Sequence, residues 1–294
     1  MSDLTGAVYD RGYRPYEGTR GGRWATRWAL WRVSVRRALG LRRSWRQKVF
    51  PWSLLGIATI PAIVNVGVGY LTRDSPIEDF EFFTYREYVG VSTTLLLFVA
   101  LTAPDIICPD RRNRALPLIF ARPLDGNDYA LVKVGAMASV LFGFSFLPQV
   151  VLFVGQMLVS DSALEYFTDN AELLWQVPLA VAVLAAHYSL VGIALSATTE
   201  RRVVGGVAIL AVAFVTSVVS SALVETSDGS SMWAVLNLLA LPLGIRDLIF
   251  LGEAADDSPL SGVSGSGVVL IAVELVVLAV CLVYLLRRYR QVRL

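Results

Sequence analysis

The chain has few residues that could perform covalent chemistry. Its 294 residues include only two lysines, Lys48 and Lys133, and each is followed by a valine. A loop that binds the phosphates of ATP has the pattern Gly-x-x-x-x-Gly-Lys-Ser/Thr, which neither lysine can complete. No catalytic triad can form around the single histidine, His187, and the cysteines Cys108 and Cys281 lack zinc-ligand spacing. We therefore expect no enzyme, no metal site and no cofactor bound by this chain itself.

Three polar residues, Asn65, His187 and Glu274, lie inside long apolar stretches. Ionisable groups inside a membrane are candidates for a transport route, because burying them is costly. They can also pair within one subunit and fix how helices pack, since an unpartnered polar group in hydrocarbon costs several kcal/mol. We favour packing and expect His187 and Glu274 each to have a polar partner, which could be the other. Asn65 fits the simpler role of an interhelical hydrogen bond.

A polar loop at residues 108–133 is the most informative segment. Its charged part precedes an apolar ridge, in the order Asp110, Arg111, Arg112, Arg114, Leu116, Leu118 and Phe120. A short amphipathic segment of this kind suits docking in the groove of a partner protein. An ordinary connecting loop explains the same pattern equally well on physical grounds.

Six long apolar blocks surround these residues. The chain is 55% hydrophobic and 17% charged, whereas soluble domains carry about a quarter charged residues. A bilayer core needs ~20 apolar residues per span, and spans of this kind are helices. The third block is long enough to tilt, kink at Pro148 or extend beyond the membrane. We predict an all-α integral membrane protein with a cytoplasmic tail at residues 1–22 and one transmembrane domain at 23–294, with spans at 50–71, 88–108, 129–159, 175–198, 203–224 and 267–286.

Charge is segregated between alternate loops. Of the 26 lysines and arginines, 23 lie in residues 1–49, 109–133, 199–202 and 287–294. The other loops hold 15 of the 24 acidic residues but only Arg73, Arg86 and Arg246 as cations. Basic loops remain in the cytoplasm, so we predict that both termini and the 109–128 loop face inward. We expect the basic segments to contact lipid and expect no nucleic acid partner.

Two further helical segments are predicted outside the spans. Residues 232–252 are apolar but contain Pro242, Arg246 and Asp247, and a span there would place the C-terminal arginines outside. We therefore predict an extracellular interfacial or re-entrant element. At the other end of the chain, residues 24–47 are predicted to form an amphipathic helix on the membrane surface that runs straight into the first span. Arginines surround its apolar stripe, which consists of Trp24, Trp28, Trp31, Val35 and Leu39.

The order of these elements resembles the permease subunits of type 2 ABC transporters, the ABCG/ABCA-like or type V exporter fold. The resemblance covers nearly the whole chain and includes the stretch Asp-Arg-Arg-x-x-x-Leu…Arg-Pro-Leu-x-x-x-Asp-Tyr…Lys. It implies that the 24–47 helix is the connecting helix of that family. It also implies that the 108–133 loop carries the coupling helix, which seats on a separate ATPase subunit that binds ATP and Mg. Carried over, the docking residues are Asp110, Arg111, Arg112, Arg114, Leu116, Leu118 and Phe120.

The same resemblance implies an exporter in the plasma membrane, built as a homodimer or as a heterodimer with a similar permease. In the family the second and fifth spans line the central cavity, and their mixed polar and aromatic residues suit an amphipathic or lipid-like substrate. Those residues are Ser92, Thr93, Thr94, Phe98, Thr102, Phe214, Thr216, Ser217, Ser220 and Ser221. Two alternatives are a secondary transporter that works without ATP, which would favour internal repeats and several intramembrane charges, and a membrane-embedded enzyme.

Overall fold

The computed structural model describes residues 21–41, 45–72, 84–89, 92–227, 231–256, 258–263 and 265–291. Within these ranges the chain is helical and contains no strand. The tail predicted at residues 1–22 lies almost wholly outside the described residues. The elements are α1 (Arg23–Ala38), α2 (Trp45–Thr72), α3 (Tyr85–Val89), α4 (Ser92–Arg112), α5 (Leu116–Phe120), α6 (Gly126–Val159), α7 (Ala163–Asp169), α8 (Leu173–Ser196), α9 (Arg202–Thr226), the 3₁₀ helix η1 (Ser231–Leu236), α10 (Leu241–Leu251) and α11 (Ser266–Arg290).

Six of these helices are long and apolar enough to cross a membrane: α2, α4, α6, α8, α9 and α11. This confirms the predicted six spans and makes the chain a multi-pass membrane protein by length and composition. The helix α6 has 34 residues, or about 51 Å at 1.5 Å per residue. That length exceeds the ~30 Å hydrocarbon core, in agreement with the long third block, which is expected to tilt, kink at Pro148 or extend beyond the membrane.

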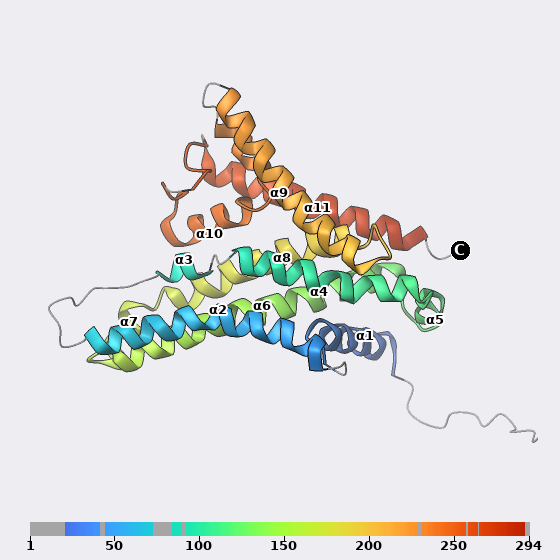
Figure 1. Cartoon of the computed structure of the whole chain (residues 1–294), viewed down its shortest axis with the longest axis horizontal. Helices are drawn as coiled ribbons and strands as arrows, with labels where there is room; N and C mark the ends of the chain where they lie inside the picture. The colour runs from blue at the N-terminus through green and yellow to red at the C-terminus, as the bar shows by residue number, and fades with distance from the viewer. Residues whose placement is uncertain are drawn as a thin grey trace, which may run out of the picture.

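The helix α8 lies at the centre of the bundle. It packs against α4, α6, α9, α10 and α11, whereas α2 packs mainly against α6. Figure 1 shows α2, α4, α6 and α8 side by side along the long axis, with α9 crossing them obliquely. The centre of the core is therefore built by α4, α6 and α8, while α2, α9 and α11 keep much of their apolar surface exposed.

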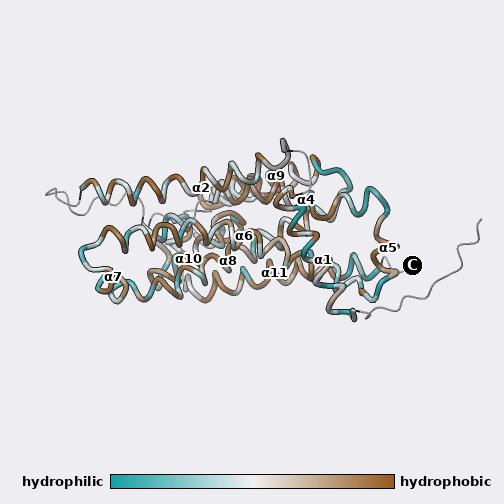
Figure 2. The backbone as a smooth tube through the Cα atoms, turned by 90° about the horizontal axis from the view of Figure 1, so that it is seen from below, coloured by the Kyte–Doolittle hydropathy of each residue, from teal (hydrophilic) through white to brown (hydrophobic). Residues whose placement is uncertain are grey.

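The polar ends of the molecule agree with the charge pattern of the sequence. Figure 1 shows α1, α5 and the C-terminal end of α11 at one end of the bundle and α7 at the other. In Figure 2 hydrophobic colour runs along the long helices, and hydrophilic colour gathers at α1 and beside α5. The basic segments predicted to share one side of the membrane thus share one end of the bundle.

The predicted single helix over residues 24–47 is wrong. The helix α1 ends at Ala38, and Gly40 adopts a left-handed conformation with φ of 65°. The N–H of Leu41 donates to Arg36 O (2.8 Å) and that of Gly40 to Arg37 O (3.1 Å), which together form a Schellman cap. Glycine adopts this conformation without a steric penalty, so Gly40 separates α1 from the first span.

The segment 232–252 does not form a span, as the sequence predicts. It comprises most of η1, a short link and the 11-residue helix α10, which ends at Leu251 and is capped by Gly252 with φ of 80°. Eleven residues reach only about 17 Å, too short for the bilayer core. The helix α10 instead packs on α8 and α11.

Candidate functional site

The carboxylate of Asp110 joins three helices at the basic end of the bundle. Its Oδ1 accepts a hydrogen bond from Arg37 of α1 at 2.5 Å. Its Oδ2 lies 2.9 Å from the Tyr129 hydroxyl and 2.8 Å from Lys133 Nζ, both on α6. Lys133 also donates to the carbonyl of Ile106, at 3.0 Å. One buried anion thereby connects the end of α4 to α1 and α6.

This arrangement corrects the predicted place of Asp110 on a docking surface. Asp110 is 3% exposed and Lys133 is fully buried. A charged group is tolerated at such a depth only when it is paired and hydrogen-bonded, so Lys133 requires an anion and holds Asp110 in the interior. Sequence reasoning did not find this pair. The sequence did contain a signal for it: Lys133 lies within an apolar helix, and a charged side chain in such a place needs a partner of opposite charge.

A second connection runs from α4 to the turn between α8 and α9. The Arg111 guanidinium donates to the carbonyls of Ala197 and of Thr199, the latter at 3.2 Å. It also lies 3.5 Å from the Glu200 carboxylate. Arg111, predicted as a docking residue, is therefore engaged with its own subunit, and movement at the end of α4 would pull on the start of α9.

The apolar ridge of α5 does not face one way. Leu116 is 8% exposed and belongs to the core, whereas Leu118 is 75% exposed. Phe120 is half-buried and meets the Tyr129 ring edge-on, with 5.9 Å between centroids. Residues four apart share a helix face and residues two apart do not, so Leu116 and Phe120 anchor the helix while Leu118 points outward. The predicted docking residues left on the surface are Arg112, Arg114 and Leu118.

The starts of α1 and α6 are fastened by ion pairs. Arg23 bonds Asp128 at 2.6 Å and Asp125 at 2.7 Å, and Arg27 bonds Asp128 at 2.6 Å. The hydrogen bond that Arg23 donates to Asp128 raises the pKa of Arg23 above its usual value. Further along α1, the Trp31 indole lies 3.3 Å from the Ser139 hydroxyl. The helix α1 therefore packs along the first third of α6.

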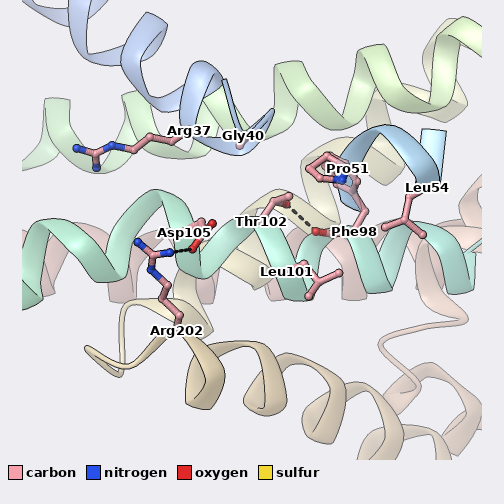
Figure 3. A pocket seen from close by; sticks show the side chains of 10 residues that line it. Arg37, Gly40, Pro51, Leu54, Phe98, Leu101, Thr102, Asp105 and Arg202 are labelled. Carbon is pink, nitrogen blue, oxygen red and sulfur yellow. Dashed lines mark hydrogen bonds and ion pairs between the residues drawn. The ribbon is translucent and has the colours of Figure 1, made fainter. Parts of the chain in front are cut away.

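A cavity of about 180 Å³ opens near this end, between the α1–α2 connection, α4 and the start of α9. Phe98 and Thr102, both predicted as pathway residues, line it (Figure 3). An ion pair of 2.9 Å between Asp105 and Arg202 forms part of its wall. The Thr102 hydroxyl already donates to the carbonyl of Phe98, at 2.6 Å. The cavity thus combines apolar surface with the Asp105–Arg202 pair and with Arg37, whose guanidinium bonds Asp110.

The other predicted pathway residues do not gather around that cavity. Ser220 donates to the carbonyl of Trp233 at 3.1 Å, and Ser217 accepts from Asn237 at 3.3 Å, so both fasten α9 to the η1 segment. Phe214 lies on the outer surface, 71% exposed. The Thr216 and Ser221 hydroxyls bond carbonyls of their own helix. Thr93 is exposed and Thr94 half-buried, while the side chain of Ser92 lies outside the described part.

The intramembrane pair is confirmed. His187 Nδ1 of α8 lies 2.9 Å and 3.0 Å from the two Glu274 carboxylate oxygens of α11. Both residues are buried, at 1% and 3% exposed. Asn65, the third polar residue, is also buried, on α2. Since α8 and α11 are in direct contact, the pair fixes the rotation of α11 against the centre of the bundle.

Replacing Glu274 by glutamine should leave the protein stable, whereas replacing it by leucine should not. The glutamine amide can still hydrogen-bond to the His187 ring, but leucine leaves a buried ring nitrogen without a partner, at a cost of about 1–3 kcal/mol. The measurement is the thermal midpoint of the purified protein, from monodisperse protein recovered by size-exclusion chromatography after heating. Equal midpoints for Glu274→Gln and Glu274→Leu would contradict a packing role.

One buried charge cluster was missed by sequence reasoning. Asp247 of α10, 1% exposed, accepts hydrogen bonds from Arg246 at 2.6 and 2.9 Å. Arg86 of α3 lies 3.6 Å from the same carboxylate. Both arginines were interpreted only as isolated cations of the outer loops. Arg86 reaches Asp247 because α3 and α10 pack beside each other on α8.

The described residues contain no group of three histidine, cysteine or acidic side chains that could hold a metal ion. Comparison of the sequence with protein-family models and with curated proteins finds no match. The class of protein is therefore defined by the fold alone. The described part of the chain is a helical, multi-pass membrane protein with a short helix, α5, at its basic end.

Proposed function

We propose that this chain is the membrane-spanning permease subunit of an ATP-driven exporter of the type 2 ABC class. It would form the route for an amphipathic or lipid-like substrate across the plasma membrane, with both termini in the cytoplasm. Two copies, or one copy and a similar permease, would work with separate ATPase subunits that bind ATP and Mg. The chain itself would hydrolyse nothing.

The observation that carries this proposal is how α5 and the end of α4 are attached to the rest of the bundle. Leu118 projects outward from a five-residue helix in which Leu116 is buried and Ile119 and Phe120 pack against the core. Asp110 and Arg111, on the last turn of α4 before α5, are bonded to α1, α6 and the α8–α9 turn. A partner that pushes on α5 would therefore move several helices at once, which a coupling element requires.

The surface of α9 supports the pairing of two permease subunits. Its large apolar residues remain exposed along the helix, including Val207, Phe214 and Val218. The helix α9 packs beside α4, and the cavity with Phe98 and Thr102 lies between α4, the start of α9 and the adjoining parts of α1 and α2. A second subunit on this face would enclose the cavity and bring the hydroxyl groups of α4 and α9 toward a common route.

The test is reconstitution with an ATPase. The chain is co-expressed with phosphate-loop ATPase subunits from its own genome, purified by a tag on the permease, and inserted into proteoliposomes. We expect one ATPase to co-purify in stoichiometric amount and ATP to drive movement of a fluorescent amphipathic probe. If no ATPase associates and the chain alone moves the probe, the proposal is wrong.

A secondary transporter is the alternative, favoured by the buried charges of the His187–Glu274 pair and of the Asp247 cluster. Such charges mark ion pathways in many transporters. The same proteoliposomes distinguish the two functions. A secondary transporter would move the probe in response to a pH gradient without ATP, and Glu274→Gln would abolish that movement.

A further inference from the structure

The cavity between the α1–α2 connection, α4 and the start of α9 is charged at one end and apolar at the other. Figure 3 shows Arg37, Asp105 and Arg202 toward one end of it. The apolar side chains of Leu54 and Phe98 lie toward the other end. Because Phe98 and Asp105 are seven residues apart on α4, the two ends are separated by about 10 Å along that helix. The cavity therefore runs from the basic end of the bundle toward the middle of the spans.

The charged end of the cavity carries an excess of positive charge. Arg37 and the buried Lys133 both bond Asp110, so two cations share one carboxylate. Arg202 pairs with Asp105, which leaves three cations against two carboxylates in this group of side chains. The Arg37 and Arg202 side chains are 33% and 44% exposed, and each bonds its carboxylate through Nη1. A guanidinium has five N–H donors, so both arginines can also bond an anion that enters the cavity.

The charged end lies where the surface of the bundle changes from polar to apolar. On α9, Arg202 is followed directly by the exposed side chains of Val203 and Val204. On α2, Pro51 lines the cavity and the next residue, Trp52, is half-exposed. Tryptophan is enriched at the boundary between membrane and water. These positions indicate that the two arginines lie at the depth of the lipid headgroups.

The cavity also opens onto apolar surface. Leu101 lines it and is 46% exposed, and Leu97, one turn earlier on α4, is 40% exposed. The volume is about 180 Å³, whereas an apolar cavity of about 150 Å³ accommodates benzene. A phosphate group and the glycerol carbons next to it are of this size, but acyl chains are too large. The chains of a lipid held here would therefore lie outside the cavity, along the exposed face of α4.

We propose that this cavity binds the headgroup of an anionic phospholipid, with its phosphate bonded by Arg37 and Arg202 and its acyl chains passing Leu101. Such a lipid supplies the negative charge that balances the excess of cations. It also places its phosphate at headgroup depth and its apolar part on apolar surface, whereas a soluble anion satisfies only the charged end. The site binds lipid whether or not the chain is an ABC permease.

The test compares two lipids with identical acyl chains, dioleoyl phosphatidylglycerol, which is anionic, and dioleoyl phosphatidylcholine, which has no net charge. Each lipid is titrated into the delipidated chain in detergent, and the bound lipid is counted by native mass spectrometry. We expect one phosphatidylglycerol per chain, bound about tenfold or more tighter than phosphatidylcholine, because hydrogen bonds to charged groups are the stronger ones. Glycerol 3-phosphate at millimolar concentration should not displace it, since that anion has no apolar part.

The variant Arg202→Gln should weaken phosphatidylglycerol about tenfold and leave phosphatidylcholine unchanged. Arg201→Gln is the matched control, because it removes the same charge from the neighbouring exposed residue, which does not line the cavity. It should bind both lipids like the unmodified protein. Leu101→Trp, at the exposed rim, should block the headgroup while it retains every charge. Equal binding of the two lipids, equal losses in Arg201→Gln and Arg202→Gln, normal binding in Leu101→Trp, or displacement by glycerol 3-phosphate would overturn the proposal.

Discussion

Replacing Leu118 by aspartate should remove the ATPase from the purified complex while the chain itself remains folded. Leu118 is 75% exposed in the single subunit, so a charge there is harmless until a partner buries it. Few residues carry most of the energy of such contacts, each worth roughly 2 kcal/mol or more. A loss of that size weakens binding about 30-fold, and the aspartate adds the cost of desolvating its charge.

The measurement is the ratio of ATPase to permease after affinity purification, together with ATP hydrolysis by the complex. Leu164→Asp is the matched control, because Leu164 of α7 is also 75% exposed, lies outside the six spans and is at the opposite end of the bundle (Figure 1). It should purify with the normal amount of ATPase. Stoichiometric ATPase and normal turnover in Leu118→Asp would place the coupling contact elsewhere on the chain.

Leu116 is the instructive contrast to Leu118. It is 8% exposed and packs in the core, so Leu116→Asp would place a charge in an apolar interior and damage folding. A loss of ATPase in that variant would therefore not identify a docking residue. Sequence alone cannot separate the two leucines, because both are apolar members of the same amphipathic segment.

Replacing Asp110 by leucine should destabilise the protein more than any single surface substitution. It leaves Lys133, fully buried, without its carboxylate, and removal of one member of a buried ion pair costs roughly 3–5 kcal/mol. Arg37 would suffer less, because its side chain is 33% exposed and can turn to water. We expect a strong fall in the thermal midpoint and in the yield of monodisperse protein.

The double variant Asp110→Leu/Lys133→Met provides the control for this prediction. It removes both buried charges and replaces them with apolar groups, which is often nearly neutral for stability. Its thermal midpoint should return most of the way to that of the unmodified protein. If the double variant is as unstable as Asp110→Leu, the loss does not arise from the unpaired lysine.

The long helices, and which of their ends lie together, were predictable because both depend on composition averaged over many residues. Six apolar blocks of about 20 residues dictate spanning helices, whatever their neighbours, since the backbone must satisfy its own hydrogen bonds in lipid. The segregation of arginine likewise predicted which ends share one side, and these ends lie together in the bundle. A polar partner for His187 was expected because an unpartnered polar group in an apolar interior is costly, although Glu274 was only one candidate.

Short elements and individual side chains could not be predicted to the same degree. The cap at Gly40 ends a helix that the sequence pattern extends to residue 47, because one left-handed residue ends a helix locally. The side chains of Leu116 and Phe120 point inward because Tyr129 and the rest of the core lie on that side of α5. The sequence of the segment does not say where the core lies. The amphipathic pattern identified the helix but not its buried face.

The sequence by itself determined that this is a six-span helical membrane protein with a basic end, because the bilayer imposes one solution on apolar segments of that length. Only the tertiary structure decided that Asp110 is enclosed by α1 and α6 and that Leu118 alone of its ridge faces outward. These features arise where helices distant in sequence meet. At these places the partner of a side chain depends on how the neighbouring helices are rotated and how far they are shifted along their axes. The periodicity of a single helix gives neither the rotation nor the shift.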